Sequence, residues 1–132
     1  MVGLLLPFLM VPHMVRGRHI VLGVDNTSVV FGWENKSSSG DLSASVLIRA
    51  LHIVATYLEC HIYAKHVPRQ SSKASVVADG LTRASTAKQE IWEMVGEVTQ
   101  YPAPKVLWDW LENPQVDWQL GLTMIDHINN IL

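Results

Sequence analysis

Apolar residues at intervals of three and four run through the middle of the 132-residue chain and predict its best-defined helix. Asp41 can cap this helix, which extends over about four turns. The apolar stripe consists of Leu42, Val46, Leu47, Ala50, Leu51, Val54, Ala55 and Leu58. Two short segments rich in β-branched residues lie on either side of the helix, at His19–Asp25 and His61–Val67. Such segments are typical of buried strands.

A strand, a helical crossover and a second strand predict a parallel βαβ unit, and therefore an α/β fold. Asn26–Asn35 adds one or two helical turns to the crossover, and Lys36–Gly40 is a predicted loop. Parallel strands end at the same edge of their sheet, where functional sites usually lie. Asp25 and His66 stand at the ends of the two predicted strands, so we expect both at this edge.

The remaining segments are predicted to be helical. Residues 1–15 are apolar and interrupted by prolines, and further helices are expected at Val76–Thr82, Thr86–Thr99, Val106–Glu112 and Trp118–Leu132. Residues 1–84 would form the α/β unit, and residues 85–132 a C-terminal extension of peripheral helices.

The apolar run Val2–Val11 raises the question of a leader or a membrane segment. Ten residues are too few for a membrane span, which needs roughly 20. No basic residue precedes the run and no small-residue cleavage site follows it, which argues against a signal peptide. A buried helix is therefore expected here, with no membrane contact.

Composition narrows the functional classes. With 48% hydrophobic and 17% charged residues, the chain is too apolar to be intrinsically disordered. The single cysteine, Cys60, excludes an intramolecular disulfide and favours a reducing, intracellular compartment such as the cytoplasm or nucleus. Residues 1–84 carry eight Lys/Arg against five Asp/Glu, and residues 85–132 carry two against seven. A polyanion would therefore suit the first part only.

Three short motifs carry the candidate chemistry: V-D-N at Val24–Asn26, K-H-V-P at Lys65–Pro68 and V-V-A-D-G-L-T-R at Val76–Arg83. Their order and spacing resemble the ribonuclease H domain of retroelement reverse transcriptases. Five further stretches are similar to those of DIRS-like elements: LLLPFL, FGWEN, LIRALH, HVPR and the WL-NP-x-x-DW pattern at Trp110–Trp118. The resemblance covers nearly the whole chain.

This resemblance implies roles for individual residues. Asp25 and Asp79 match two of the family's metal-binding carboxylates, and His66 matches a histidine near the scissile phosphate. In that family two Mg²⁺ ions promote cleavage of the RNA strand of an RNA–DNA hybrid. A reverse transcriptase domain would precede the ribonuclease H domain in a longer polyprotein. Four basic residues surround the expected site, either as phosphate contacts or as a solvated loop face: Lys65, Arg69, Lys73 and Arg83.

The chain departs from the family pattern in ways that matter for activity. The family's first metal-binding Asp and a helical Glu lie upstream of the position of Asp25, whereas residues 1–24 contain no acidic residue. Arg69 replaces a frequent glycine, and Ser75 an asparagine. The resemblance thus implies a domain without its first three strands, a remnant or a truncated gene product with weak or absent Mg²⁺ binding and no cleavage activity. The missing strands should also leave the 42–58 stripe and Leu4–Val11 partly exposed.

Other interpretations remain open. Taken singly, Asp25 is a helix cap, Asp79 a solvated charge at a helix start, and His66 a loop histidine. The chain would then be a non-catalytic domain that binds nucleic acid or protein, or an unrelated α/β protein with an apolar N-terminal contact segment. The five tryptophans are expected to be core or helix-packing anchors rather than nucleobase platforms. His13, His52 and His127 show no spacing typical of metal ligands.

Overall fold

A computed structural model of the chain describes residues 2–24, 27–35, 42–68, 89, 93, 96, 99 and 101–132. The helices are α1 (Val2–Met10), α2 (Pro12–Val15), α3 (Thr27–Asn35), α4 (Leu42–Tyr57), α7 (Lys105–Glu112) and α8 (Leu120–Ile131), and the strands are β1 (His19–Val24) and β2 (His61–His66). The predicted loop at 36–40 and helix at 76–82 lie outside the described residues, as does most of the predicted helix at 86–99.

The two strands pair in parallel, as the sequence predicts. His19 is the Cα partner of His61, and Val24 is the partner of His66. Hydrogen bonds beyond the strand ends extend the pairing, from His61 N to the Arg18 carbonyl at 3.0 Å and from Val67 N to the Val24 carbonyl at 2.8 Å. The mixed α/β class, the two adjacent parallel strands and their helical crossover are therefore confirmed.

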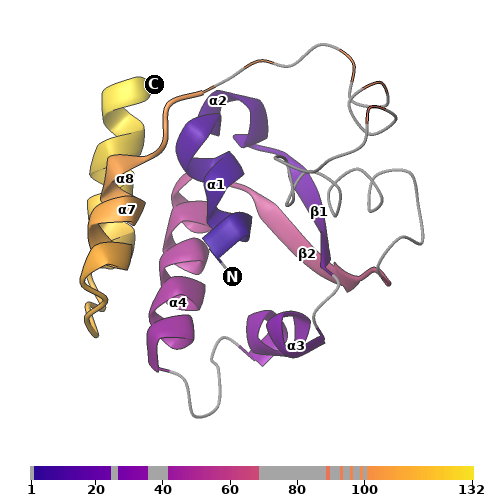
Figure 1. The fold of residues 1–132 in the computed structure, drawn as a ribbon, viewed down its shortest axis with the longest axis horizontal. Helices are drawn as coiled ribbons and strands as arrows, with labels where there is room; N and C mark the ends of the chain where they lie inside the picture. Colours follow the sequence, from indigo (N-terminus) through magenta and orange to yellow (C-terminus); the bar gives the residue numbers. More distant parts are fainter. Residues whose placement is uncertain are drawn as a thin grey trace.

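Helix α4 is the centre of the molecule, with α7 and α8 on one side and the two strands on the other (Figure 1). Its stripe forms a helix because apolar residues recur on one face, and that face is buried. Leu51 and Val54 are fully inaccessible to solvent. Complete burial of such a side chain contributes about 1.5–3 kcal/mol. Leu42, at the first turn, is exposed instead.

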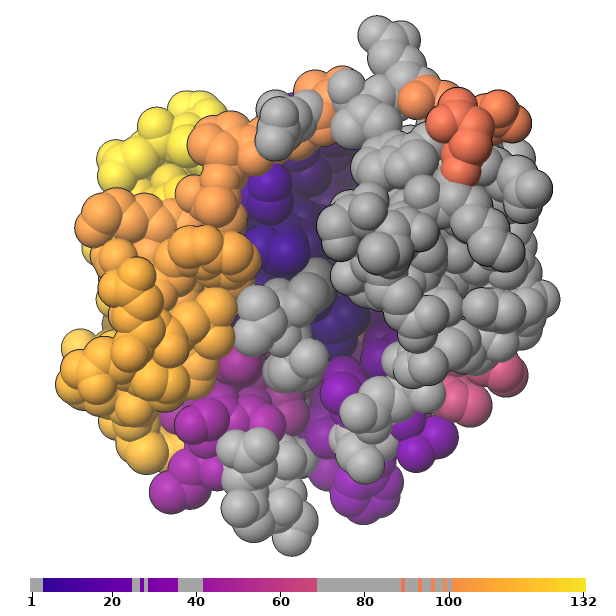
Figure 2. Space-filling view, in the orientation of Figure 1, coloured from indigo at the N-terminus to yellow at the C-terminus, as the bar shows by residue number. Residues whose placement is uncertain are grey.

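The N-terminal segment packs on this stripe, and the stripe residues from Val46 to Leu58 are buried, so for the stripe the expectation of partial exposure is wrong. Helix α1 packs against α4, α2 and α8. Leu5, Phe8 and Leu9 are all 0% exposed, whereas the other residues of Leu4–Val11 are partly exposed, so the predicted helix has one buried face. The surface is hollowed where this indigo segment lies beside the orange and yellow C-terminal helices (Figure 2).

The C-terminal helices are less peripheral than the sequence suggests. Helix α8 packs along α4, and its Met124 and Ile128 are fully buried in the central core. Leu107 of α7 belongs to the same core. Two polar contacts reinforce the arrangement, because the Tyr57 hydroxyl of α4 donates to Asn129 Oδ1 of α8 and His127 Nε2 lies 3.0 Å from the Leu9 carbonyl oxygen.

The tryptophans divide into two groups. Trp33 and Trp110 are buried core anchors, as expected, and the Trp110 indole N–H donates to the Gln115 carbonyl at 3.0 Å. Trp108 and Trp118 are more than 40% exposed, so they do not lie in the core. The Arg49 guanidinium covers the Trp118 ring at 4.5 Å, which attaches the segment before α8 to α4. Trp92 lies outside the described residues.

No helix within the described residues is long and apolar enough to cross a membrane.

Candidate functional site

The carboxyl ends of β1 and β2 are the first candidate site. Val24 and His66 are Cα partners at this edge, and Asp25 is the residue that follows Val24 in the chain. His66 and Lys65 are both exposed. Asp25, Asp79, Arg69, Lys73 and Arg83 lie outside the described residues, so the assignment of the two carboxylates to one metal site stays a prediction.

Close packing at this edge explains why a glycine precedes the V-D-N motif. A Cβ atom added to Gly23 would lie 2.9 Å from Val67 Cγ2, which is closer than carbon atoms normally approach. Gly23 therefore allows the chain after β2 to remain hydrogen-bonded to Val24. The local sequence thus fixes the two strand ends side by side.

Metal ligation can be tested only in part. Among the residues that the structure describes, no three His, Cys, Asp or Glu side chains are grouped closely enough to hold a metal ion. The two carboxylates assigned by resemblance are outside this set. As a donor set, two carboxylates suit a hard cation such as Mg²⁺, which prefers oxygen ligands. Two carboxylates are too few for two such ions.

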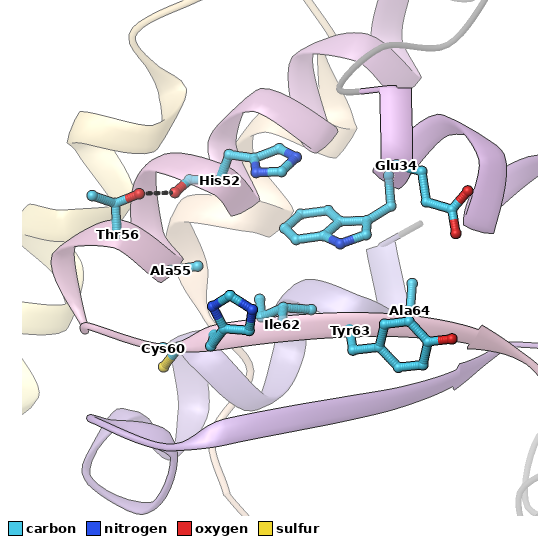
Figure 3. Close-up of a pocket in the computed structure, with 10 residues that line it drawn as sticks. Glu34, His52, Ala55, Thr56, Cys60, Ile62, Tyr63 and Ala64 are labelled. Carbon is cyan, nitrogen blue, oxygen red and sulfur yellow. Dashed lines mark hydrogen bonds between the residues drawn. The ribbon is translucent and has the colours of Figure 1, made fainter.

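A second candidate is a pocket of about 390 Å³ between α3, α4 and β2. Its walls are Trp33 and Glu34 of α3, His52, Ala55 and Thr56 of α4, and Cys60–Ala64. Figure 3 shows the Ile62 and Ala64 side chains on the side of β2 that faces α4, whereas the Tyr63 ring points away from that helix. The Trp33 and His52 rings stack with centroids 3.7 Å apart and planes inclined by 2°. Neither residue was predicted to form a site.

Cys60 contributes structure rather than reactivity to this pocket. Its thiol donates to the Val15 carbonyl at 3.0 Å. Burial raises the pKa of the Cys60 thiol above its usual range, although hydrogen bonds from the Arg18 and Gly17 backbone oppose the shift. A raised pKa leaves less thiolate at neutral pH, and the thiolate is the reactive form.

A third hollow, of about 560 Å³, lies between α7 and α8. Some of its polar groups have structural partners. Lys105 Nζ donates to Asp109 Oδ2 at 2.8 Å, and this bond raises the pKa of Lys105. Asp117 Oδ1 accepts a hydrogen bond from the Gln119 backbone N–H at 2.9 Å, at the start of α8. The hollow thus lies beside an exposed ion pair on α7 and a hydrogen-bonded turn before α8.

Sequence reasoning placed candidate residues at the strand ends but missed the stacked pair. Trp33 and His52 are 19 positions apart on different helices. No periodic or spacing signal joins them, and only the docking of α3 against α4 and β2 brings them together. The FGWEN and LIRALH stretches, noted for their resemblance, contain one member of the pair each.

Comparisons of the chain with protein-family models, with curated proteins and with solved structures gave no match.

Proposed function

We propose that the chain corresponds to the C-terminal part of a ribonuclease H-like domain from a DIRS-like retroelement polyprotein, and that it does not cleave RNA by itself. The observation that supports this most is the register of the two strands. Because Val24 pairs with His66, the strand that precedes Asp25 and the strand that ends in His66 finish together. Parallel strands joined by helices, with an acid after one and a histidine at the end of the other, suit that family.

The proposed chemistry belongs to the strand ends. Asp25 and Asp79 would be the metal ligands, and Mg²⁺ bound there would activate water and stabilise a leaving oxygen in phosphodiester hydrolysis. His66 is exposed at the same edge and is free to approach a phosphate. With no acidic residue among positions 1–24, the donor set supports one weakly held cation at most.

Binding of Mn²⁺, which can replace Mg²⁺, tests this assignment. In an NMR titration of the full chain, we expect paramagnetic broadening of amide signals around Val24, His66 and position 79. Asp25→Asn and Asp79→Asn should each remove the broadening. Glu34→Gln is the matched control, since Glu34 is exposed, close in sequence and outside the proposed ligand set. Broadening that persists in Asp25→Asn would refute the proposed site.

Activity gives an independent test. The chain should show no cleavage of an RNA–DNA hybrid in Mg²⁺ or Mn²⁺, because cleavage requires two metal ions, one on each side of the scissile phosphate. Cleavage that Asp25→Asn abolishes would overturn the proposal of inactivity while supporting the ancestry.

Retained hybrid binding is the second candidate function. Lys65 is exposed and forms no ion pair with the residues that the structure describes, so it is available to a phosphate. If Lys65, Arg69, Lys73 and Arg83 contact phosphates, the affinity should fall steeply with salt concentration, and Lys65→Ala should make the slope shallower by about one unit. Affinity for the hybrid that does not change between low and high salt would exclude this function.

A further inference from the structure

Two histidines lie side by side at the start of the sheet, at the opposite end from the proposed carboxylate site. His19 is the first residue of β1, His61 is the first residue of β2, and the two are Cα partners in the parallel register. Their ring centroids are 5.3 Å apart, with the planes inclined by 44°. Both residues are exposed. The pair therefore presents two imidazole rings to solvent from neighbouring positions of adjacent strands.

The backbone fixes the spacing of the two histidines. The His61 N–H donates to the Arg18 carbonyl at 3.0 Å, which joins the two strands where they begin. Immediately before Arg18, the Gly17 N–H donates to the Leu58 carbonyl at 2.9 Å. Gly17 has a φ of 71°, a conformation that glycine adopts without steric cost. Because hydrogen bonds hold both strand starts, the two Cα positions are set before any ligand binds, and such preorganisation lowers the cost of binding.

The distance between the rings matches that of two imidazoles on one tetrahedral metal ion. Zn–N bonds are about 2.0–2.1 Å long, so the centroid of a bound imidazole lies about 3.2 Å from the ion. Two rings at the tetrahedral angle then have centroids about 5.2 Å apart. The observed separation of 5.3 Å is therefore already that of a bound pair. What remains is a rotation of each ring that turns one nitrogen toward the ion.

The donor atoms determine which metals suit this pair. Neutral imidazole nitrogen is a common ligand of Zn²⁺, Cu²⁺ and Ni²⁺, whereas Mg²⁺ prefers oxygen ligands. Because both histidines are exposed, water can occupy the remaining coordination positions. Structural zinc sites have four protein ligands, so a site with two is expected to be open and to exchange its metal readily.

We propose that His19 and His61 bind one divalent transition-metal ion of the Zn²⁺ class, through one imidazole nitrogen each. The site is independent of the proposed magnesium site, because it uses nitrogen donors at the amino ends of the strands, whereas Asp25 follows the carboxyl end of β1. A packing contact between two aromatic rings has similar centroid distances, of about 4.5–7 Å, and is the alternative that the experiment must exclude. Such a contact predicts no metal binding at these residues.

Isothermal titration calorimetry of the full chain, without an affinity tag, tests the proposal with ZnCl₂. We expect saturable binding of one Zn²⁺ ion per chain, with no competition from a large excess of Mg²⁺. His19→Gln and His61→Gln should each weaken binding by at least about tenfold, since the loss of a group that only orients a metal ligand already costs about 10–100-fold. An absence of saturable binding, or one ion shared by two chains, would overturn the proposal.

Control variants and NMR spectroscopy locate the ion. His13→Gln is the matched control, since His13 is exposed on α2 and lies outside the pair. Cys60→Ser removes the only thiol of the chain, next to His61 in the sequence. Both variants should keep the affinity of the unmodified chain, and circular dichroism of every variant separates loss of a ligand from loss of the fold. Zn²⁺ should shift the side-chain nitrogen signals of His19 and His61 and leave those of His13 in place. Affinity that persists in His19→Gln, or that is lost in folded Cys60→Ser, would place the ion elsewhere and refute the proposed site.

Discussion

The contact between α8 and α4 can be tested at Gly121, where two effects of opposite sign compete. Gly121 is buried in α8, and a Cβ atom added there would lie 2.8 Å from Ile53 Cβ, 2.9 Å from Cδ1 and 3.0 Å from Cγ2. Alanine is favoured over glycine inside a helix by about 1 kcal/mol. The contacts are about 0.5–1 Å shorter than the van der Waals optimum, and overpacking of this kind costs about 1–3 kcal/mol. Because Ile53 Cβ is fixed to the backbone, the helices must shift.

We therefore expect Gly121→Ala to lower the free energy of unfolding by about 1 kcal/mol. Repacking costs about 2 kcal/mol, and the higher helix propensity of alanine offsets about 1 kcal/mol of this cost. Ile53→Ala removes the clashing side chain. In that background Gly121→Ala should instead stabilise the protein by about 1 kcal/mol. The coupling free energy is then about 2 kcal/mol, large for a double-mutant cycle.

Urea unfolding, followed by far-ultraviolet circular dichroism and tryptophan fluorescence, measures all four proteins of this cycle. Similar m-values are required for the comparison, since a changed m-value indicates a changed unfolded state. An effect of Gly121→Ala that is the same in both backgrounds would show that α8 does not pack closely on α4.

Three further predictions concern the core, the thiol and the surface. Met124→Ala, at a fully buried position, should lower the free energy of unfolding by about 2–5 kcal/mol. Leu122→Ala, at an exposed position of the same helix, should lower it by less than about 0.5 kcal/mol. Similar losses in the two variants would contradict a buried face on α8. Cys60 should react with iodoacetamide more slowly than an unstructured cysteine peptide at pH 8, because its raised pKa leaves less thiolate, and rapid alkylation of the folded chain would argue against a buried thiol. Lys105→Ala should not shift the urea midpoint, since its ion pair with Asp109 is solvent-exposed; a clear shift would mean that this pair is stabilising.

The sequence predicts the βαβ part of the fold because its signals are local. The stripe of α4 has the helical period, and the strand segments are short, with Ile20, Val21 and Val24 in one and Ile62 in the other as β-branched residues. The bounds of both strands agree with the structure to within one residue. These features depend on neighbouring residues along the chain and need no knowledge of what covers them.

The sequence does not predict which element covers which face. Periodicity marks the apolar side of α4 but does not identify its partner, and it predicts helices in residues 85–132 without showing that they pack on α4. In the structure α8 presents Met124 and Ile128 to the core while its acidic and polar residues remain outside. The sequence likewise does not predict the exposure of Trp118. This exposure depends on the position of the residue before α8 and on its contact with Arg49 of α4. Such pairings are tertiary and leave no pattern in either segment.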